Sequence, residues 1–109
     1  MGCGGNRYPI KRARMGEVAS LYADKVVLCD DNPRDECGDQ IIQDICSGMQ
    51  KVDSSVIRDR NAAFQHALAD ANKGDWIIVA GKGHERQQII KGKQLAHCDR
   101  EMVRQACEV

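Results

Sequence analysis

Three short polar segments carry side chains that could bind a small charged molecule. They are GGNR (4–7), DDNPR (30–34) and GKGHE (81–85). An arginine can hold a carboxylate through two parallel hydrogen bonds, and a carboxylate can accept hydrogen bonds from an ammonium group. Two aspartates beside an arginine, as in DDNPR, therefore indicate one wall of a pocket for a molecule that carries both charges.

Two of these segments follow apolar runs, VVLC (26–29) and WIIVA (76–80). A short continuous apolar run is typical of a parallel strand that is buried on both faces, and WIIVA is the strongest such signal in the chain. GGNR looks like the loop after a strand, although no strand precedes it in this sequence. Open α/β sheets bind ligands where the carboxyl ends of their parallel strands meet. We therefore expect the three polar segments to converge at that edge.

The other patterns predict an α/β fold in which helices and strands alternate. SSVI (54–57) is a weaker strand, and QQII and QLAH flank a turn in a predicted C-terminal antiparallel hairpin. Apolar residues recur at helical spacing in four places, so we expect helices over 13–23, 41–49, 63–71 and 102–107, with Asp59 and Asp99 as caps of the last two. Residues 1–109 should form a single domain with a mainly parallel sheet flanked by helices.

Composition argues against several classes of function. The 16 basic and 16 acidic residues balance and the basic residues are scattered, so nothing indicates a nucleic-acid partner. No apolar run approaches the ~18 residues that a membrane span requires. None of the six cysteines forms a C-x-x-C pair, and we interpret them as reduced, mostly buried thiols of a cytoplasmic protein. A zinc site through His97, Cys98 and a distant cysteine is the weaker alternative.

Each polar segment alone has a more common explanation than a binding site. GGNR matches neither the dinucleotide fingerprint nor the P-loop spacing, and by itself is more often a tight turn. DNPR alone is a proline turn with an exposed arginine, and His84 alone is usually a surface histidine. Only the convergence of the three segments gives a functional site equal weight with these explanations.

A longer pattern resembles one family over essentially the whole chain. It contains GCGGNR, KR and MG near the start, then ADKVVLCDDNPR, II-x-DI-x2-GM, DR-x3-F and AGKGHE in register. This pattern is similar to the C-terminal domain of the Mur ligases, in particular those that add the third amino acid to UDP-N-acetylmuramoyl-L-alanyl-D-glutamate. The combination of DNPR and AGKGHE is the most specific part of the resemblance. It implies a Rossmann-like fold without the strand–helix–strand that opens the domain in the family.

The resemblance also implies that this domain binds the incoming amino acid, which DNPR indicates to be meso-diaminopimelate. The positions it assigns to substrate binding are Arg7, Asn32, Arg34, Gly81 and Glu85. Beside Glu85, Asp31 could also accept an ammonium group. Meso-diaminopimelate differs from lysine by a second carboxylate, which the guanidinium of Arg34 can hold. Lysine would leave Arg34 without that partner, and an unpaired polar group gives strong discrimination.

The chain departs from the family's pattern in ways that bear on catalysis. Tyr8 stands where the family has an aspartate on the nucleotide side, and Ala13 replaces a proline. The resemblance implies ATP and Mg²⁺ as cofactors of the full-length ligases, whose phosphate loop lies in a central domain that has no match here. We therefore expect no bound cofactor, no catalytic residue and no ligase activity in this chain.

Two functions stay open at this point. The chain is either the amino-acid-binding domain of a meso-diaminopimelate-adding ligase of peptidoglycan biosynthesis, excised or encoded as a fragment, or a stand-alone, non-catalytic binding module derived from it. In both cases the missing strands would leave a sheet edge and apolar side chains uncovered. We therefore expect a homodimer or a higher homo-oligomer.

Overall fold

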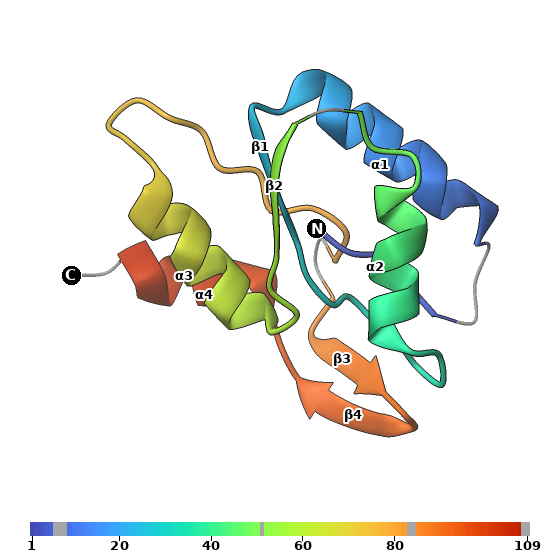
Figure 1. Ribbon diagram of the computed structural model, residues 1–109. Coiled ribbons are helices and arrows are strands. Elements are labelled where there is room, and N and C mark those ends of the chain that lie inside the picture. Colours follow the sequence, from blue (N-terminus) through green and yellow to red (C-terminus); the bar gives the residue numbers. More distant parts are fainter. Residues whose placement is uncertain (6–8, 51, 83–84, 108–109) are drawn as a thin grey trace.

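Helices and short strands alternate along the chain (Figure 1). The computed structural model describes residues 1–5, 9–50, 52–82 and 85–107. In chain order the elements are α1 (Ile10–Tyr22), β1 (Lys25–Leu28), α2 (Gly38–Cys46), β2 (Asp53–Val56), α3 (Arg60–Asp70), β3 (Gln87–Ile90), β4 (Lys93–Ala96) and α4 (Asp99–Cys107). The predicted α/β class is confirmed.

The strands form one parallel pair and one antiparallel hairpin. β1 and β2 pair in parallel, with Val26 opposite Ser54 and Leu28 opposite Val56. Helices α1 and α2 lie on one side of this pair, and α3 and α4 lie on the other (Figure 1). β3 and β4 form the antiparallel hairpin that the sequence predicted, turned at Lys91 and Gly92, which both have positive φ.

The core is aliphatic and lies between β1 and α2. Its buried members are Cys3, Val26, Leu28, Ile41, Ile42 and Ile45. The three isoleucines fall on one face of α2, which is the spacing that predicted this helix. This face of α2 packs against β1 and so fixes the position of the strand. The loop that follows Leu28 begins at the end of this fixed strand.

The first five residues lie along the edge of β1 that β2 does not occupy. The amino group of Met1 donates to the Val27 carbonyl at 2.8 Å, and the Cys29 amide donates to the Met1 carbonyl at 2.8 Å. The Gly5 amide then donates to the Asn32 carbonyl at 2.7 Å. The start of the chain is thereby held against the loop that follows β1.

The predicted strand over WIIVA is wrong. Residues 75–80 have no regular secondary structure, and Trp76 and Ile78 are 90% and 83% exposed. A strand requires a neighbour for its backbone hydrogen bonds. On the open edge of β1, only Met1 makes such bonds among the described residues, and a wide groove separates the rest of β1 from residues 76–79. The apolar run therefore has no strand beside it.

Two smaller predictions about single residues also need correction. The cysteines are free but not mostly buried, because Cys37, Cys46 and Cys107 are exposed at the ends of α2 and α4. Asp59 caps α3 as predicted, accepting from the Ala62 amide at 3.0 Å. Asp99 begins α4 without capping it, since its carboxylate instead contacts Arg60 and His97.

None of the described helices has the length and apolar character needed to cross a membrane.

Candidate functional site

The loop after β1 is the centre of the candidate site. Asp30, Asp31 and Asn32 are all buried, although each carries a polar side chain. Residues 1–5 lie against this loop, and Gly81 and Glu85 also approach it. The convergence predicted for the three polar segments is therefore present for the residues that the structure describes.

Asn32 links the β1 loop to the segment around residue 85. Its side-chain nitrogen donates to Glu85 Oε2 at 3.2 Å, and its side-chain oxygen accepts from Lys82 Nζ and from the Ile89 amide, both at 2.9 Å. Lys82 Nζ also lies 2.9 Å from Asp31 Oδ1. That carboxylate oxygen has no well-directed hydrogen bond, so its contact with Lys82 is an ion pair. Buried polar groups of this kind are stabilised by such pairing.

Arg34 is held in a left-handed backbone conformation, with φ of 54°. The hairpin holds it there, because the Arg34 amide donates to the Ile89 carbonyl at 2.9 Å and the Lys91 amide donates to the Arg34 carbonyl at 2.6 Å. Nη1 of Arg34 donates to the Gly5 carbonyl at 2.9 Å. Nε and Nη2 make no hydrogen bond to a described residue. Together they form an edge of the guanidinium that can bind a carboxylate through two parallel hydrogen bonds.

Glycine is needed at two positions for these loops to meet. A Cβ at Gly5 would lie 1.7 Å from the Pro33 carbonyl oxygen, so only glycine permits this close approach. Gly81 has a φ of 113°, which side chains of L residues rarely adopt. A Cβ there would lie 3.3 Å from the Gly2 carbonyl oxygen. Gly81 thus lets the chain turn so that the next residue, Lys82, points inward.

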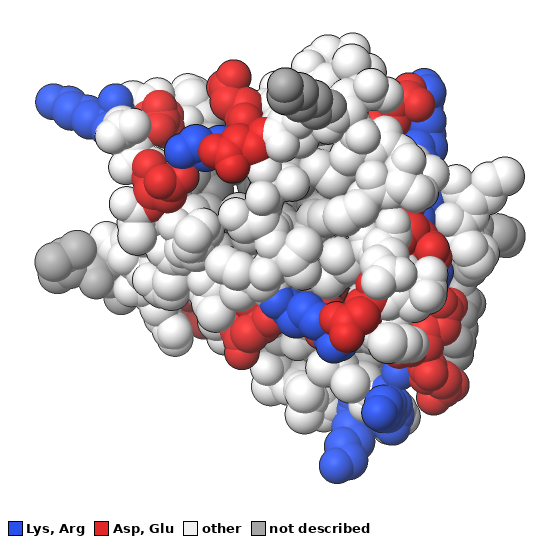
Figure 2. Space-filling view, in the orientation of Figure 1, with Lys and Arg blue, Asp and Glu red and all other residues white. Residues whose placement is uncertain are grey.

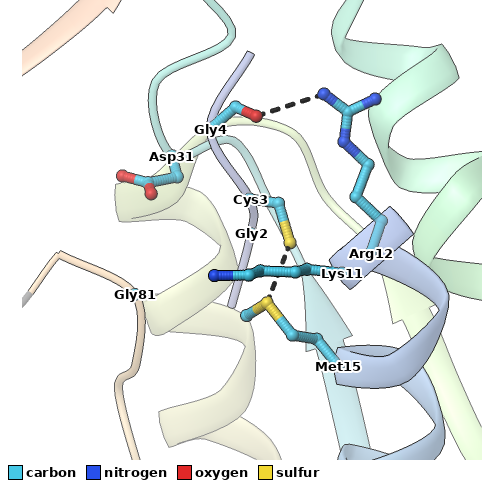
Figure 3. A pocket seen from close by; sticks show the side chains of 8 residues that line it. All are labelled: Gly2, Cys3, Gly4, Lys11, Arg12, Met15, Asp31 and Gly81. Carbon is cyan, nitrogen blue, oxygen red and sulfur yellow. Dashed lines mark hydrogen bonds between the residues drawn. The ribbon is translucent and has the colours of Figure 1, made fainter. Parts of the chain in front are cut away.

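A small pocket of about 250 Å³ opens beside these loops (Figure 3). Arg12 closes one side of it, donating to the Gly4 carbonyl and pairing with Glu36 and Asp44. Burial raises the pKa of the Cys3 thiol above its ordinary value, and the thiol donates to the Met15 sulfur at 3.3 Å. The lining residues are Gly2, Cys3, Gly4, Lys11, Arg12, Met15, Asp31 and Gly81.

A buried ion pair lies beneath the site and connects its loops. Arg60 forms two hydrogen bonds with Asp99, Nε to Oδ1 at 2.8 Å and Nη2 to Oδ2 at 2.7 Å. It also donates to the carbonyls of Asp30 and Ala80. Burial opposes ionisation of Asp99, but the hydrogen bonds from Arg60 and His97 outweigh it and hold the pKa of Asp99 below its usual value. The pair therefore fixes the loops after residues 29 and 79 to α4.

The structure brings together most of the residues that the sequence predicted for substrate binding. Asp31, Asn32 and Glu85 share one network through Lys82, while Gly81 and Arg34 lie in the same group of loops. Arg7 lies outside the described residues. Sequence reasoning missed Lys82 and Arg60, since charged residues are almost always on the surface. Two glycines flank Lys82 directly after an apolar run, which is the one signal that could have identified it.

The surface charges show no patch of a single sign on the face seen in Figure 2, where acidic and basic side chains lie close together around a broad uncharged area.

Among the described residues, no group of three histidine, cysteine, aspartate or glutamate side chains could hold a metal ion. The zinc alternative through His97 and Cys98 therefore has no third ligand in that part of the chain.

Comparison with known proteins identifies the family. Residues 1–83 match the model of the glutamate ligase domain of the Mur ligases, which is well over half of the chain. The chain belongs to the Mur ligase family. It is homologous to the C-terminal domain of the ligases named UDP-N-acetylmuramoyl-L-alanyl-D-glutamate--2,6-diaminopimelate ligase.

Relatives of this Mur ligase domain match it over nearly its full length. The ligase of that name from Alkalilimnicola ehrlichii is 51% identical over 105 residues, and the one from Vibrio vulnificus is 47% identical over 105 residues. These matches cover 96% and 95% of this chain but only 21% of each relative. A solved structure of a ligase of the same name superposes with a TM-score of 0.91 at 38% identity, covering 97% of this chain and 22% of that one. The chain spans about a fifth of the length of these relatives.

Proposed function

We propose that this chain is the amino-acid-binding domain of a cytoplasmic ligase that adds meso-diaminopimelate to UDP-N-acetylmuramoyl-L-alanyl-D-glutamate in peptidoglycan biosynthesis. The observation that carries the proposal is the group formed by Arg34, Asn32 and Glu85 at one edge of the fold. The names of the relatives, with about half of the residues identical, support the same substrate. Residues 1–109 would then act as one domain within a larger enzyme.

The charges of the site fit the two ends of diaminopimelate. The free Nε–Nη2 edge of Arg34 would hold the carboxylate that lysine lacks, because a planar guanidinium matches a carboxylate with two bonds. Glu85, whose side chain is 48% exposed, would accept an ammonium group, with Asp31 adding negative charge behind it. Gly81, with no side chain, would leave room for the ligand near Asp31. Arg7 is proposed as a further substrate contact from its place in the motif alone.

ATP and Mg²⁺ would serve the complete ligase, where they activate the carboxylate that the amino acid attacks. We assign no step of that chemistry to this chain. The role of this domain would be to bind and orient the amine that becomes the new amide nitrogen. Holding a reactant in position can lower a barrier without any covalent chemistry by the side chains that hold it.

Nuclear magnetic resonance can test where an amino acid binds. Titrating ¹⁵N-labelled chain with meso-diaminopimelate should shift the backbone amide signals of Asn32, Arg34 and Glu85 progressively until they saturate. These amides lie in the loops that would contact the ligand. Shifts confined to Ile77 and Ile78, or no shift at millimolar ligand, would contradict the proposed function.

We also propose that a second copy of the chain covers the open edge of β1. A groove of about 820 Å³ runs between β1, α3 and residues 74–79, and its walls include Val26, Phe64, Trp76 and Ile77. Backbone groups alternate in direction along a strand, so those of Lys25 face the groove, as the Val27 carbonyl bonded to Met1 does. An open strand edge beside exposed apolar side chains favours association between chains. The exposed segment 76–80 of another copy has the apolar character to fill it.

Light scattering at micromolar concentration should therefore give the mass of a dimer or a larger oligomer. Changing Ile78 to glutamate should shift the population toward monomer, because a charge at this exposed apolar position is costly to bury. Leu21→Glu is the matched control, since Leu21 is also exposed but lies outside the groove. A wild-type monomer with a sharp cooperative melt would refute the proposed dimer.

A further inference from the structure

Lys82 is an unusual lysine because its side chain is completely buried, with 0% of its area exposed. Its ammonium group donates to Asn32 Oδ1 at 2.9 Å and to the Gln87 carbonyl at 2.8 Å. It also lies 2.9 Å from Asp31 Oδ1 and 3.7 Å from Glu85 Oε2. A buried ammonium group is stable only when charges and acceptors surround it in this way. Among the described residues, the polar partners of Lys82 are Asp31, Asn32 and Glu85 of the candidate site and Gln87 of β3.

The contacts of Lys82 determine which way the Asn32 amide points. An ammonium group and a backbone N–H can only donate hydrogen bonds, so the Asn32 atom that both of them contact must be the oxygen. The nitrogen of the same amide then faces Glu85 Oε2 at 3.2 Å. If Lys82 were replaced by an apolar residue, one of the two groups that hold the oxygen would be lost. The amide could then rotate and present its oxygen to Glu85, which would repel it.

The positive charge of Lys82 also offsets the negative charges of Asp31 and Glu85. Asp31 is buried, whereas the Glu85 side chain is about half exposed and can reach a ligand from its open side. Lys82 and the Asn32 amide both contact Oε2 of the Glu85 carboxylate, and 48% of the Glu85 side chain is exposed. Arg60, which reaches the carbonyls of Asp30 and Ala80, holds the same two loops from below.

We propose that Lys82 is a positioning residue for the amino-acid site. Its ammonium group fixes the Asn32 amide with the nitrogen toward Glu85, and this fixed pair presents the Glu85 carboxylate to the ammonium group of the ligand. The inference rests on the proposed function for the identity of the ligand, an amino acid. The orientation of the Asn32 amide does not depend on any ligand and is tested in the free chain.

Substituting Lys82 with methionine tests this role, because methionine keeps an unbranched side chain and removes the charge. In the free wild-type chain, the side-chain NH₂ signals of Asn32 should be dispersed and should exchange slowly with water. In Lys82→Met the chemical shifts of these signals should move toward those of a solvent-exposed asparagine. Their protons should exchange with water at least about tenfold faster, since the amide has lost a fixed partner. Lys73→Met, which removes an exposed lysine, should leave these signals unchanged.

Two further variants keep the test decisive if Lys82→Met does not fold. Lys82→Arg retains a buried cation and should restore slow exchange of the Asn32 signals at least in part. Asn32→Asp retains the acceptor for Lys82 and Ile89 but puts a second carboxylate against Glu85, so it should weaken binding of meso-diaminopimelate by about tenfold or more. Unchanged Asn32 signals in Lys82→Met, or fast exchange in the wild type, would overturn the positioning role. If these signals behave as expected while no amino acid binds, the proposed function fails and the positioning of Asn32 stands.

Discussion

Replacing Arg34 with alanine should weaken binding of meso-diaminopimelate about ten- to a hundredfold while leaving the affinity for L-lysine nearly unchanged. A charge-assisted pair of hydrogen bonds between a guanidinium and a carboxylate contributes about 1.5–3 kcal/mol, and 1.4 kcal/mol corresponds to tenfold in affinity. Lysine has no second carboxylate and so gains nothing from Arg34. Alanine also has a Cβ, so the strain of the positive φ at residue 34 is present in both proteins.

Two controls make the Arg34 result specific. Arg34→Lys keeps the positive charge but not the planar fork, so its loss for meso-diaminopimelate should be intermediate. Arg14→Ala removes an exposed arginine whose hydrogen bond is to Glu17 on the same helix, and it should change neither affinity. Calorimetric titration measures the affinity of the wild type and of each variant for both amino acids. An equal loss for both amino acids in Arg34→Ala would contradict the assignment of Arg34 to the second carboxylate.

Replacing Arg60 with methionine should reduce the free energy of unfolding by about 3–5 kcal/mol, because removing one partner leaves the buried Asp99 carboxylate without its main counter-charge. The carbonyls of Asp30 and Ala80 would also lose a donor. Urea denaturation followed by circular dichroism measures the loss. The double variant Arg60→Met with Asp99→Leu should recover part of it, since both charges are then removed together. No recovery, together with a loss below about 1 kcal/mol in the single variant, would contradict a structural role for the pair.

The pH dependence of stability gives a second measure of the same ion pair. The pKa of Asp99 is lowered in the folded protein, because its hydrogen bonds with Arg60 and His97 outweigh the effect of burial. Its contribution to stability is therefore complete above the unfolded-state pKa of about 3.9 and is lost as the pH falls through the lower pKa of the folded state. The difference in stability between wild type and Arg60→Met should narrow as the pH falls below about 4. A constant difference across this range would show that Asp99 is not held ionised by Arg60.

Local patterns in the sequence were enough to predict the helices and the hairpin. The isoleucines of α2 form one apolar face, and the Asp59 cap of α3 satisfies a free backbone amide within its own turn. Both signals act over a few residues. The strand predicted at WIIVA was wrong because a strand depends on a neighbour that may lie anywhere in the chain, and none pairs with residues 76–80 in the described structure.

The sequence pointed to the polar residues of the candidate site but not to the contacts that position them. Asn32, Arg34 and Glu85 lie in segments whose composition and resemblance already indicated binding. The hairpin that fixes the backbone of Arg34 and the contact between Lys82 and Asn32 are tertiary effects between residues fifty or more positions apart in the chain. No local pattern contains that information, and a lysine or an arginine in a sequence is on average a surface residue.

Titration calorimetry of the unmodified chain can test whether this Mur ligase domain binds an amino acid with two carboxylates, as we propose. Meso-diaminopimelate and L-lysine should be compared at the same pH and salt concentration, because exposed charges are screened by salt. Meso-diaminopimelate should bind at least about tenfold more tightly than lysine. Equal affinities for the two amino acids, or tighter binding of lysine, would contradict it.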